Sequence, residues 1–352
     1  MLQIVQLTQC SFWVDSNLNY VHFGLKYNFM PILLPKVSKQ IQSEDIREVI
    51  EKNFVTIMPL WSVAQMTWVN GVYETFHDHE KFMIVIHLLM KTFDIYSKNF
   101  VKLNYEEYFD QTKVEIEEIN IMEISISLNI PKETTRRKIN ELEKMGTIKK
   151  TKKNFIIDRD TWPNIKPEET IKRMSRFLSF LSKMCFTEGL MSEPISSEDI
   201  TKTSKEYFSH IWKLYYEMQL PFLLSYKKIY GDLESFHICG TVVSNHALNS
   251  KKKDNSKMSK EFYLEKYFLA DKKDSGSINA MSISDITGIP RATVIRKLKK
   301  LVKDKNLKID EKKHYSTTRI NTKNILEAQK GVLKDLSKLT SSVYNLTLMK
   351  KN

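Results

Sequence analysis

The sequence has 352 residues, which corresponds to two or three domains of ordinary size. Hydrophobic residues make up 41% of it, and glycine and proline number only nine each, so a disordered chain and a turn-rich β-sandwich or barrel are both disfavoured. The formal net charge is +13. Residues 131–153 hold nine Lys or Arg and three Glu, residues 291–313 hold ten Lys or Arg and three acids, and the rest is neutral overall. Charge concentrated in two short segments predicts two surfaces that contact an anionic partner.

The first 49 residues have no secretory signal pattern, because they lack a basic start followed by an apolar run. The longest strongly apolar run, Phe82–Met90, is too short to span a membrane. Cys10, Cys185 and Cys239 are isolated and do not have the spacing of metal ligands. We therefore expect reduced thiols in a cytoplasmic protein that does not contact a membrane.

An internal repeat organises the chain. A shift of 159 residues aligns 119–149 with 278–308 without a gap, and 13 of these 31 positions are identical, among them Arg137/Arg296 and Lys138/Lys297. Upstream the shift becomes 154. The first repeat then spans about 50–158 and the second about 204–317. The predicted organisation is an N-terminal segment of unassigned role (1–49), a first unit (50–158), a connecting helix and linker (159–203), a second unit (204–320) and a C-terminal helix (321–352).

Each unit is expected to begin with three helical segments, placed in the second repeat at about 204–217, 220–230 and 233–247. Their aromatic side chains are expected to fill the core, with a ligand pocket lined by some of them as the alternative; they are Trp61, Trp68, Trp212, Tyr215 and Phe222. The polar run 250–256 is expected to be a solvated loop, since the five extra residues of the second repeat fall between about 238 and 262. An amphipathic helix follows each unit.

The basic segment of the second repeat has the pattern of two short helices joined by a tight turn. Ser282 is expected to cap the first helix, Gly288 suits a left-handed turn, and Pro290 starts the second helix. Helical spacing places Val294, Leu298 and Leu301 on an inner face and Arg296 and Lys303 on the outer face. A helix that reads the major groove of DNA needs such a docked apolar side and an exposed polar side.

A β-hairpin with a basic tip is expected to follow in both repeats. In the first repeat, the run 146–150 and the run 154–158 flank Thr151-Lys152-Lys153. The second repeat has the corresponding runs around Glu311-Lys312-Lys313. Two departures are noted: Asn129 replaces the turn glycine, and Lys305-Asn306 stands where a glycine precedes the first strand, so the second hairpin is allowed a different position.

These motifs resemble winged helix-turn-helix DNA-binding proteins, in particular MarR-like bacterial regulators, over about 40 residues of each repeat. The resemblance implies that the second helix reads base edges and that the hairpin, or wing, grips the DNA backbone. The implied DNA contacts are Lys132, Thr134, Arg136, Arg137, Asn140, Lys150, Lys152 and Lys153 in the first unit, and Arg291, Thr293, Ile295, Arg296, Lys299, Lys312 and Lys313 in the second.

The run His77-Asp78-His79-Glu80 is interpreted as a helix start capped by Asp78, because only its acids recur in the second repeat. The sequence has no Gly-rich phosphate loop, nucleophile elbow or paired catalytic carboxylates. We therefore expect no enzyme activity, no cofactor and no metal.

The sequence thus predicts a mainly α-helical fold with two tandem winged helix-turn-helix modules that carry small β-hairpin wings. The predicted function is a nucleoid-associated transcriptional regulator that reads two half-sites of double-stranded DNA. A plasmid-type replication initiator remains an alternative, as does a chromosome-organising or assembly protein whose winged helices bind protein. The target sequence, activation or repression, any small-molecule effector and homodimer formation stay open.

Overall fold

The computed structural model describes residues 40–349 apart from 112, 118–119, 152–153, 159–166, 251–276 and 319–321, together with four short strands nearer the N-terminus. The chain divides into two units, Met1–Gln40 and Ile41–Asn352, which are described separately. The smaller unit has two two-stranded antiparallel sheets. Their strands are β1 (Gln6–Leu7) with β2 (Cys10–Ser11) and β3 (Trp13–Val14) with β4 (Val21–His22).

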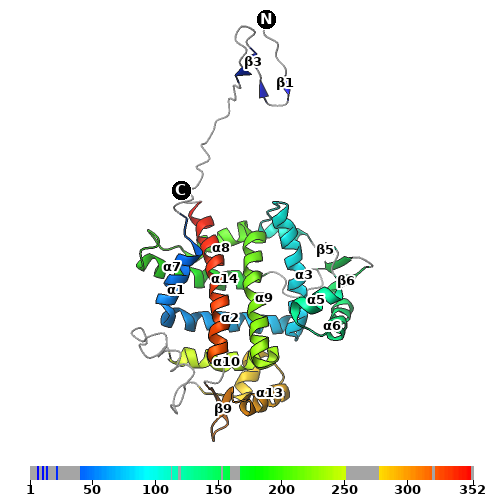
Figure 1. Ribbon diagram of the computed structural model, residues 1–352, viewed down its shortest axis with the longest axis vertical. Helices are drawn as coiled ribbons and strands as arrows, with labels where there is room; N and C mark the ends of the chain where they lie inside the picture. Colours follow the sequence, from blue (N-terminus) through cyan, green and yellow to red (C-terminus); the bar gives the residue numbers. More distant parts are fainter. Residues whose placement is uncertain are drawn as a thin grey trace. The chain divides into compact units, whose positions relative to one another are not determined.

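The larger unit is mainly helical and begins with the first repeat (Figure 1). Its helices are α1 (Ser43–Lys52), α2 (Phe54–Phe76), α3 (His79–Lys98), α4 (Tyr105–Asp110), α5 (Ile121–Leu128), α6 (Lys132–Lys144) and α7 (Glu168–Thr187). Strands β5 (Lys113–Glu117), β6 (Ile148–Lys150) and β7 (Asn154–Asp158) form an antiparallel sheet in the order β5-β7-β6. The compact unit therefore begins ahead of residue 49, because α1 packs against helices of this unit.

The second half of this unit, which is the second repeat with a flanking helix at each end, gives the same kinds of element in the same order, apart from α4, whose equivalent position lies outside the described residues. Its helices are α8 (Ser197–Glu206), α9 (Phe208–Tyr230), α10 (Leu233–Ser250), α12 (Ala280–Thr287), α13 (Arg291–Lys303) and α14 (Thr322–Leu348). Strands β8 (Ile278–Asn279), β9 (Leu307–Ile309) and β10 (His314–Thr317) form an antiparallel sheet in the order β8-β10-β9. The polar run expected as a loop after Ser250 lies outside the described residues.

The helices of the two repeats are intertwined rather than separate. Helix α2 packs on α10 and α9 packs on α3, while α1 packs on α14 and α8 packs on α7. Figure 1 shows α9 and α14 side by side, with α2 crossing behind them. At the centre, Gln219 Nε2 donates a hydrogen bond of 2.9 Å to Oε1 of Gln65, and these two residues occupy the same position of the repeat. The two repeats thus form one core around an approximate two-fold relation.

Helix α9 runs unbroken through Pro221, so the helix break expected between residues 217 and 220 is wrong. A proline inside a helix removes one backbone hydrogen bond and usually bends the helix. Here Leu220, Phe222 and Leu223 on either side of Pro221 are buried, and their packing compensates for the lost bond. No helix in the described part of the chain is long and apolar enough to cross a membrane.

The aromatic side chains of α2 and α9 are buried as expected. Trp212 stacks on Tyr215 with ring centroids 4.8 Å apart, and Trp68 meets Tyr215 edge-to-face at 6.2 Å. Cys185 and Cys239 are free thiols buried in the same core, and burial raises the pKa of each to about 12. These thiols are therefore un-ionised and unreactive at neutral pH.

Candidate nucleic-acid interface

An asparagine cap starts the first helix of each helix pair. Asn120 Oδ1 accepts a hydrogen bond of 2.9 Å from the backbone N–H of Glu123, and Asn279 Oδ1 accepts one of 2.9 Å from Ser282. The cap of α12 is therefore Asn279, and the expectation that Ser282 caps this helix is wrong. Asn279 provides the cap because its side chain reaches the third N–H of the helix. Ser282 supplies that N–H instead.

The turn between the two helices has the left-handed conformation expected from the sequence. Asn129 ends α5 with φ 48°, and Gly288 ends α12 with φ 69°. Asparagine tolerates this conformation better than most residues, so the turn survives without glycine. Pro131 and Pro290 are the N-cap residues of α6 and α13. The second helix was expected to start at Pro290, and it begins one residue later, at Arg291.

The outer face of α13 is basic and carries no acid. Val294, Leu298 and Leu301 are buried beneath it, and the helix packs on α10 and α12. The predicted contact residues Arg291, Arg296 and Lys299 are exposed, and Thr293 and Ile295 are half-buried at the edge of the face. Within the described residues, no carboxylate pairs with Arg291, Arg296, Lys299 or Lys303. These four cations are available to an anionic partner.

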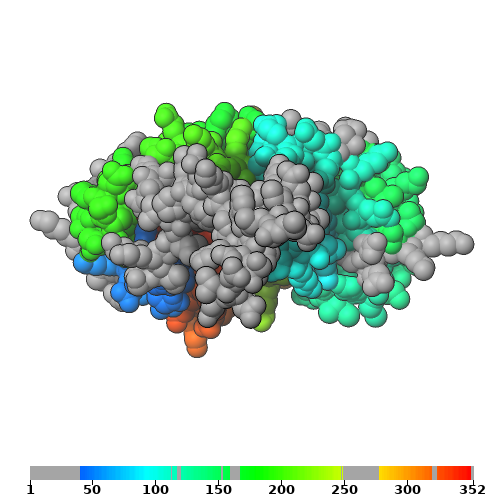
Figure 2. Space-filling view, turned by 90° about the horizontal axis from the view of Figure 1, so that it is seen from above, coloured from blue at the N-terminus to red at the C-terminus, as the bar shows by residue number. Residues whose placement is uncertain are grey.

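The matching face of α6 is largely neutralised by acids of its own. Lys132, Arg136, Arg137 and Asn140 are exposed and Thr134 is half-buried. Arg136 pairs with Glu133, and Arg137 Nη1 lies 2.6 Å from Oε1 of Glu141. Helix α6 holds five basic and three acidic residues, whereas α13 holds six basic residues and no acid. The α3 and α6 region, cyan to green, gathers at one end of the view in Figure 2.

Glu141 is held in its charged form on this face. Its other carboxylate oxygen lies 2.8 Å from Nζ of Lys81 on α3. The hydrogen bond from Lys81 is the main reason that the pKa of Glu141 is lowered, and Arg137 adds to it. The acid thus competes with any external anion for Arg137.

The hairpins expected after each helix pair are present as β6–β7 and β9–β10. Lys150 is exposed on β6, whereas Lys152 and Lys153 lie outside the described residues. Lys312 and Lys313 are exposed in the turn between β9 and β10. Lys305 takes the left-handed conformation (φ 59°) of its counterpart Gly146 (φ 78°), so both hairpins leave their helix in the same way.

Each hairpin is extended to a sheet by a third strand that the sequence analysis missed. Strand β5 pairs with β7 and β8 pairs with β10. Val114 and Ile116 of β5 are buried while the residues between and beside them are charged. This alternation of apolar and charged residues is the sequence pattern from which strand β5 could have been predicted.

A lysine on the inner side of each second helix pairs with acids at the start of a long helix; Lys138 is buried and Lys297 is half-buried. Lys138 on α6 pairs with Asp78, and its Nζ lies 3.4 Å from Oε2 of Glu80 at the start of α3. Lys297 on α13 repeats this with Asp232 at 2.6 Å and Glu234 at 3.8 Å on α10. Burial raises the pKa of Asp232, but hydrogen bonds from Lys297 and Ser235 outweigh burial and lower it. The identity of the two lysines in the repeat therefore has a structural cause.

Asp78 also caps α3 by accepting hydrogen bonds from the backbone N–H groups of Glu80 and Lys81, which confirms the capping prediction.

Each helix pair also touches the long helix of the other repeat. Lys227 of α9 donates a hydrogen bond of 2.9 Å to the backbone oxygen of Asn129 and pairs with Glu80 at 2.7 Å. In the other half, the Tyr73 ring of α2 comes within 4.0 Å of where a Cβ would lie on Gly288. The two helix pairs are therefore anchored by the shared core and not by separate domains.

A buried histidine pair joins the two halves between these anchors. His79 Nε2 and His237 Nδ1 are 3.1 Å apart, and His237 Nε2 lies 2.6 Å from Oδ1 of Asn70. Both hydrogen bonds form between neutral groups if each imidazole ring carries its proton on Nε2, so that His79 donates to His237 and His237 donates to Asn70. Burial lowers the pKa of His79 to about 4 and also lowers that of His237. In the described part of the chain, no group of three or more His, Cys, Asp or Glu side chains could hold a metal ion.

The histidine pair predicts acid sensitivity. In the unfolded chain the His79 side chain has a pKa near 6.5, whereas in the folded protein its pKa is about 4. The free energy of unfolding is therefore at its full value above about pH 6.5 and falls as the pH is lowered towards 4. The loss reaches about 3 kcal/mol when His79 is protonated. Replacing His79 with Leu and His237 with Met, the residues at the matching positions 233 and 83, should flatten this pH dependence. Urea unfolding between pH 4.5 and 7.5 measures it; equal slopes for both proteins would contradict the assignment.

Lys303 is a further candidate contact that the predicted set omitted. It is exposed on the face of Arg296 and Lys299, and their i, i+3, i+7 spacing was the signal.

Comparison with protein-family models, with curated proteins and with solved structures finds no match for this chain. The function is therefore inferred from the surfaces described above.

Proposed function

We propose that the chain binds double-stranded DNA through two winged helix-turn-helix units and acts as a transcriptional regulator. The first unit comprises α5, α6 and the β5–β7 sheet, and the second comprises α12, α13 and the β8–β10 sheet. The observation that carries the proposal is the outer face of α13. There, Arg296, Lys299 and Lys303 are exposed and have no acidic partner among the described residues, while the inner face is docked on the core.

The elements around α13 suit contact with a duplex. A helix of this kind offers side chains to the base edges of the major groove, while lysines in the following hairpin reach phosphates. Lys312 and Lys313 occupy that hairpin turn. The α6 unit has the same order of elements but fewer unpaired cations, so it contributes less charge to binding. Both units belong to one core, and one chain therefore offers two reading helices.

The proposal predicts a strong salt dependence of binding. If the two units together neutralise on the order of 6 phosphates, the logarithm of the association constant falls with the logarithm of salt concentration with a slope of about −5. Fluorescence anisotropy of a labelled 30-base-pair duplex between 50 and 300 mM salt measures the slope. A slope near −2, or binding that ignores salt, would mean that at most one unit touches DNA.

A further inference from the structure

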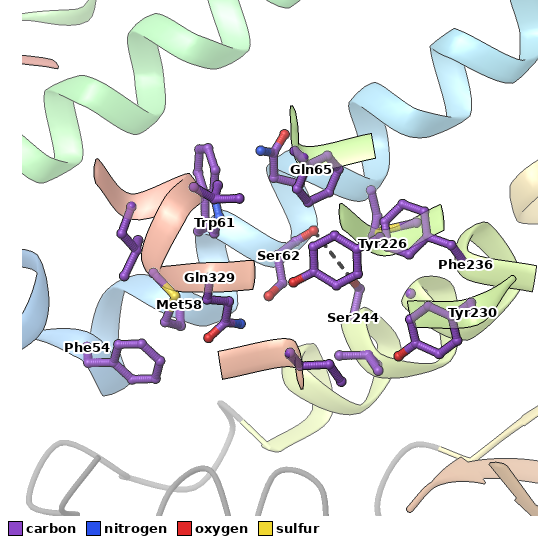
Figure 3. Close-up of a pocket in the computed structure, with 17 residues that line it drawn as sticks. Phe54, Met58, Trp61, Ser62, Gln65, Tyr226, Tyr230, Phe236, Ser244 and Gln329 are labelled. Carbon is purple, nitrogen blue, oxygen red and sulfur yellow. Dashed lines mark hydrogen bonds between the residues drawn. The ribbon is translucent and has the colours of Figure 1, made fainter. Parts of the chain in front are cut away.

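A cavity of about 70 Å³ lies in the core between α2, α9, α10 and α14 (Figure 3). Its walls are mainly aromatic and aliphatic, and they include Trp61, Met66, Phe222, Tyr226, Phe236 and Val332. Tyr226 stacks on Phe236 with ring centroids 4.6 Å apart, which gives the cavity a flat, rigid side. Among the described residues, no charged side chain lines it. The cavity therefore suits an uncharged, flat molecule.

Polar groups in the wall are left without partners. Gln65 is 4% exposed, and its Nε2 has no hydrogen-bond partner among the described residues because Gln219 engages only its Oε1. Gln329 Oε1, in the wall contributed by α14, is likewise buried without a partner among the described residues. Leaving such groups unpaired costs free energy that a ligand with a matching acceptor and donor recovers.

The repeat supplies an internal comparison. Tyr215, Gln219 and Thr170, which occupy the positions of Trp61, Gln65 and Gln329 in the repeat, line a smaller cavity of about 30 Å³ together with Trp61 and Gln65 themselves. This smaller cavity therefore straddles the two repeats and does not reproduce the larger one.

Larger side chains occupy the positions that are equivalent to part of the larger cavity's wall. Four wall residues have such larger counterparts in the repeat. They are Met58, Ser62, Gly240 and Ser244, and their counterparts are Trp212, Tyr216, Ile86 and Met90, respectively. Trp212, Tyr216 and Ile86 are buried there. The same framework thus accepts large side chains at these positions, so the hollow is not required by the fold.

We propose that the larger cavity binds a neutral, single-ring aromatic ligand that carries a hydroxyl or amide group to pair with Gln65 and Gln329. A cavity of ~150 Å³ is known to hold benzene, so a ring needs more room than the 70 Å³ seen here. Met66 provides it. Its flexible side chain fills the space beside Gly240, where a Cβ would lie only 2.5 Å from Sδ.

The ligand would lie against α10, the helix on which the basic helix α13 packs. Helix α10 lines the cavity with Phe236, Gly240 and Ser244, and it packs on α12 and α13. A ligand that moves Met66 presses on α10 and thereby shifts α13. Ligand binding itself does not rest on the proposed function, whereas this regulatory consequence does.

Isothermal titration calorimetry of the full chain with phenol, without DNA, tests the binding. Saturable phenol binding is expected, while benzene and benzoate bind at least tenfold more weakly, because benzene lacks the polar group and benzoate is charged. Gly240→Ile places the residue of position 86 in the cavity and should weaken phenol binding at least tenfold. Ser244→Met, which places the residue of position 90 there, should do the same.

Gly71→Ile is the matched control, because a Cβ at Gly71 on α2 meets no atom of the described residues within 4 Å. It should leave phenol affinity within twofold of the wild type. Circular dichroism verifies that each variant is folded. If Gly240→Ile does not fold, Ser244→Met alone provides the test of a filled cavity. Absence of saturable phenol binding by the folded wild type, or undiminished binding by the folded filled variants, would overturn the proposal. If the wild-type protein binds phenol but does not bind DNA, the ligand proposal stands and the proposed function is contradicted.

Discussion

Replacing Arg296, Lys299 and Lys303 together with glutamine is expected to lower affinity for duplex DNA on the order of 100-fold or more at ~0.1 M salt, because three unpaired cations are removed from the face that we propose contacts the DNA. All three side chains are exposed on α13, so the fold should be unaffected. Fluorescence anisotropy with a labelled duplex measures the loss, and the salt slope should become less steep by about 0.9 for each phosphate contact removed.

The matched control is the same change at Arg137, Asn140 and Lys144, which occupy the equivalent positions of α6. We expect a loss of about tenfold or less, since one of these residues carries no charge and Arg137 already has a carboxylate partner in Glu141. A surface ion pair is worth only ~0–1 kcal/mol, so Glu141 weakens this contact without abolishing it. An equal or larger loss from the α6 variant would show that the charge difference between the two helices does not govern binding.

The local parts of the candidate interface could be predicted from the sequence because they depend on neighbouring residues. The left-handed turn at Gly288 needs only the absence of a Cβ, and the inner face of α13 follows from the spacing of Val294, Leu298 and Leu301. The hairpins follow from the runs of β-forming residues. The cap was missed at Asn279 because Asn and Ser compete for the same role three residues apart.

The second large effect is expected from the inward-facing lysines, Lys138 and Lys297. Lys297→Met should destabilise the protein by about 3 kcal/mol, because Glu234 loses its cation and Asp232 keeps only the more distant Lys300, at 3.6 Å, while both acids remain partly buried. The α13 helix also loses its tether to α10. Urea unfolding at pH 7 measures the change, with Lys299→Met on the exposed side of the same helix expected to cost less than ~0.5 kcal/mol.

A rescue experiment separates the loss of charge pairing from the loss of packing. In the Lys297→Met background, Asp232→Asn together with Glu234→Gln removes the unpaired negative charge and should restore part of the stability. Stability unchanged by Lys297→Met would contradict the ion-pair account of why this lysine and Lys138 are identical in the two repeats.

The long-range parts of the fold could not be derived from the sequence. Lysine is rarely buried, so nothing local distinguishes the buried Lys138 and the half-buried Lys297 from the exposed basic residues beside them. The exchange of helices between repeats depends on packing between residues that are far apart in the chain, as in the hydrogen bond between Gln65 and Gln219. A repeat alone is equally compatible with two separate domains. The cavity depends on the same packing, because its walls come from both repeats.

Selection of bound sequences from a random pool of duplexes tests the central claim most directly, namely that two unequal helices of one chain read DNA. Arg137 and Arg296 are equivalent and exposed, so each half-site should share one feature, a guanine contacted through N7 and O6. The neighbours differ, with Asn140 against Lys299 and Arg136 against Ile295. We therefore expect two related but unequal half-sites whose centres are about 10 base pairs apart or a multiple of that.

The same selection with Arg296→Ala should relax one half-site only, at a cost of ~1–3 kcal/mol. An origin-like array of repeated sites would point to a replication initiator that uses the same surfaces. A perfect palindrome would show that two chains each supply one unit, and a pool without enrichment would show that neither helix reads sequence; either result contradicts the account.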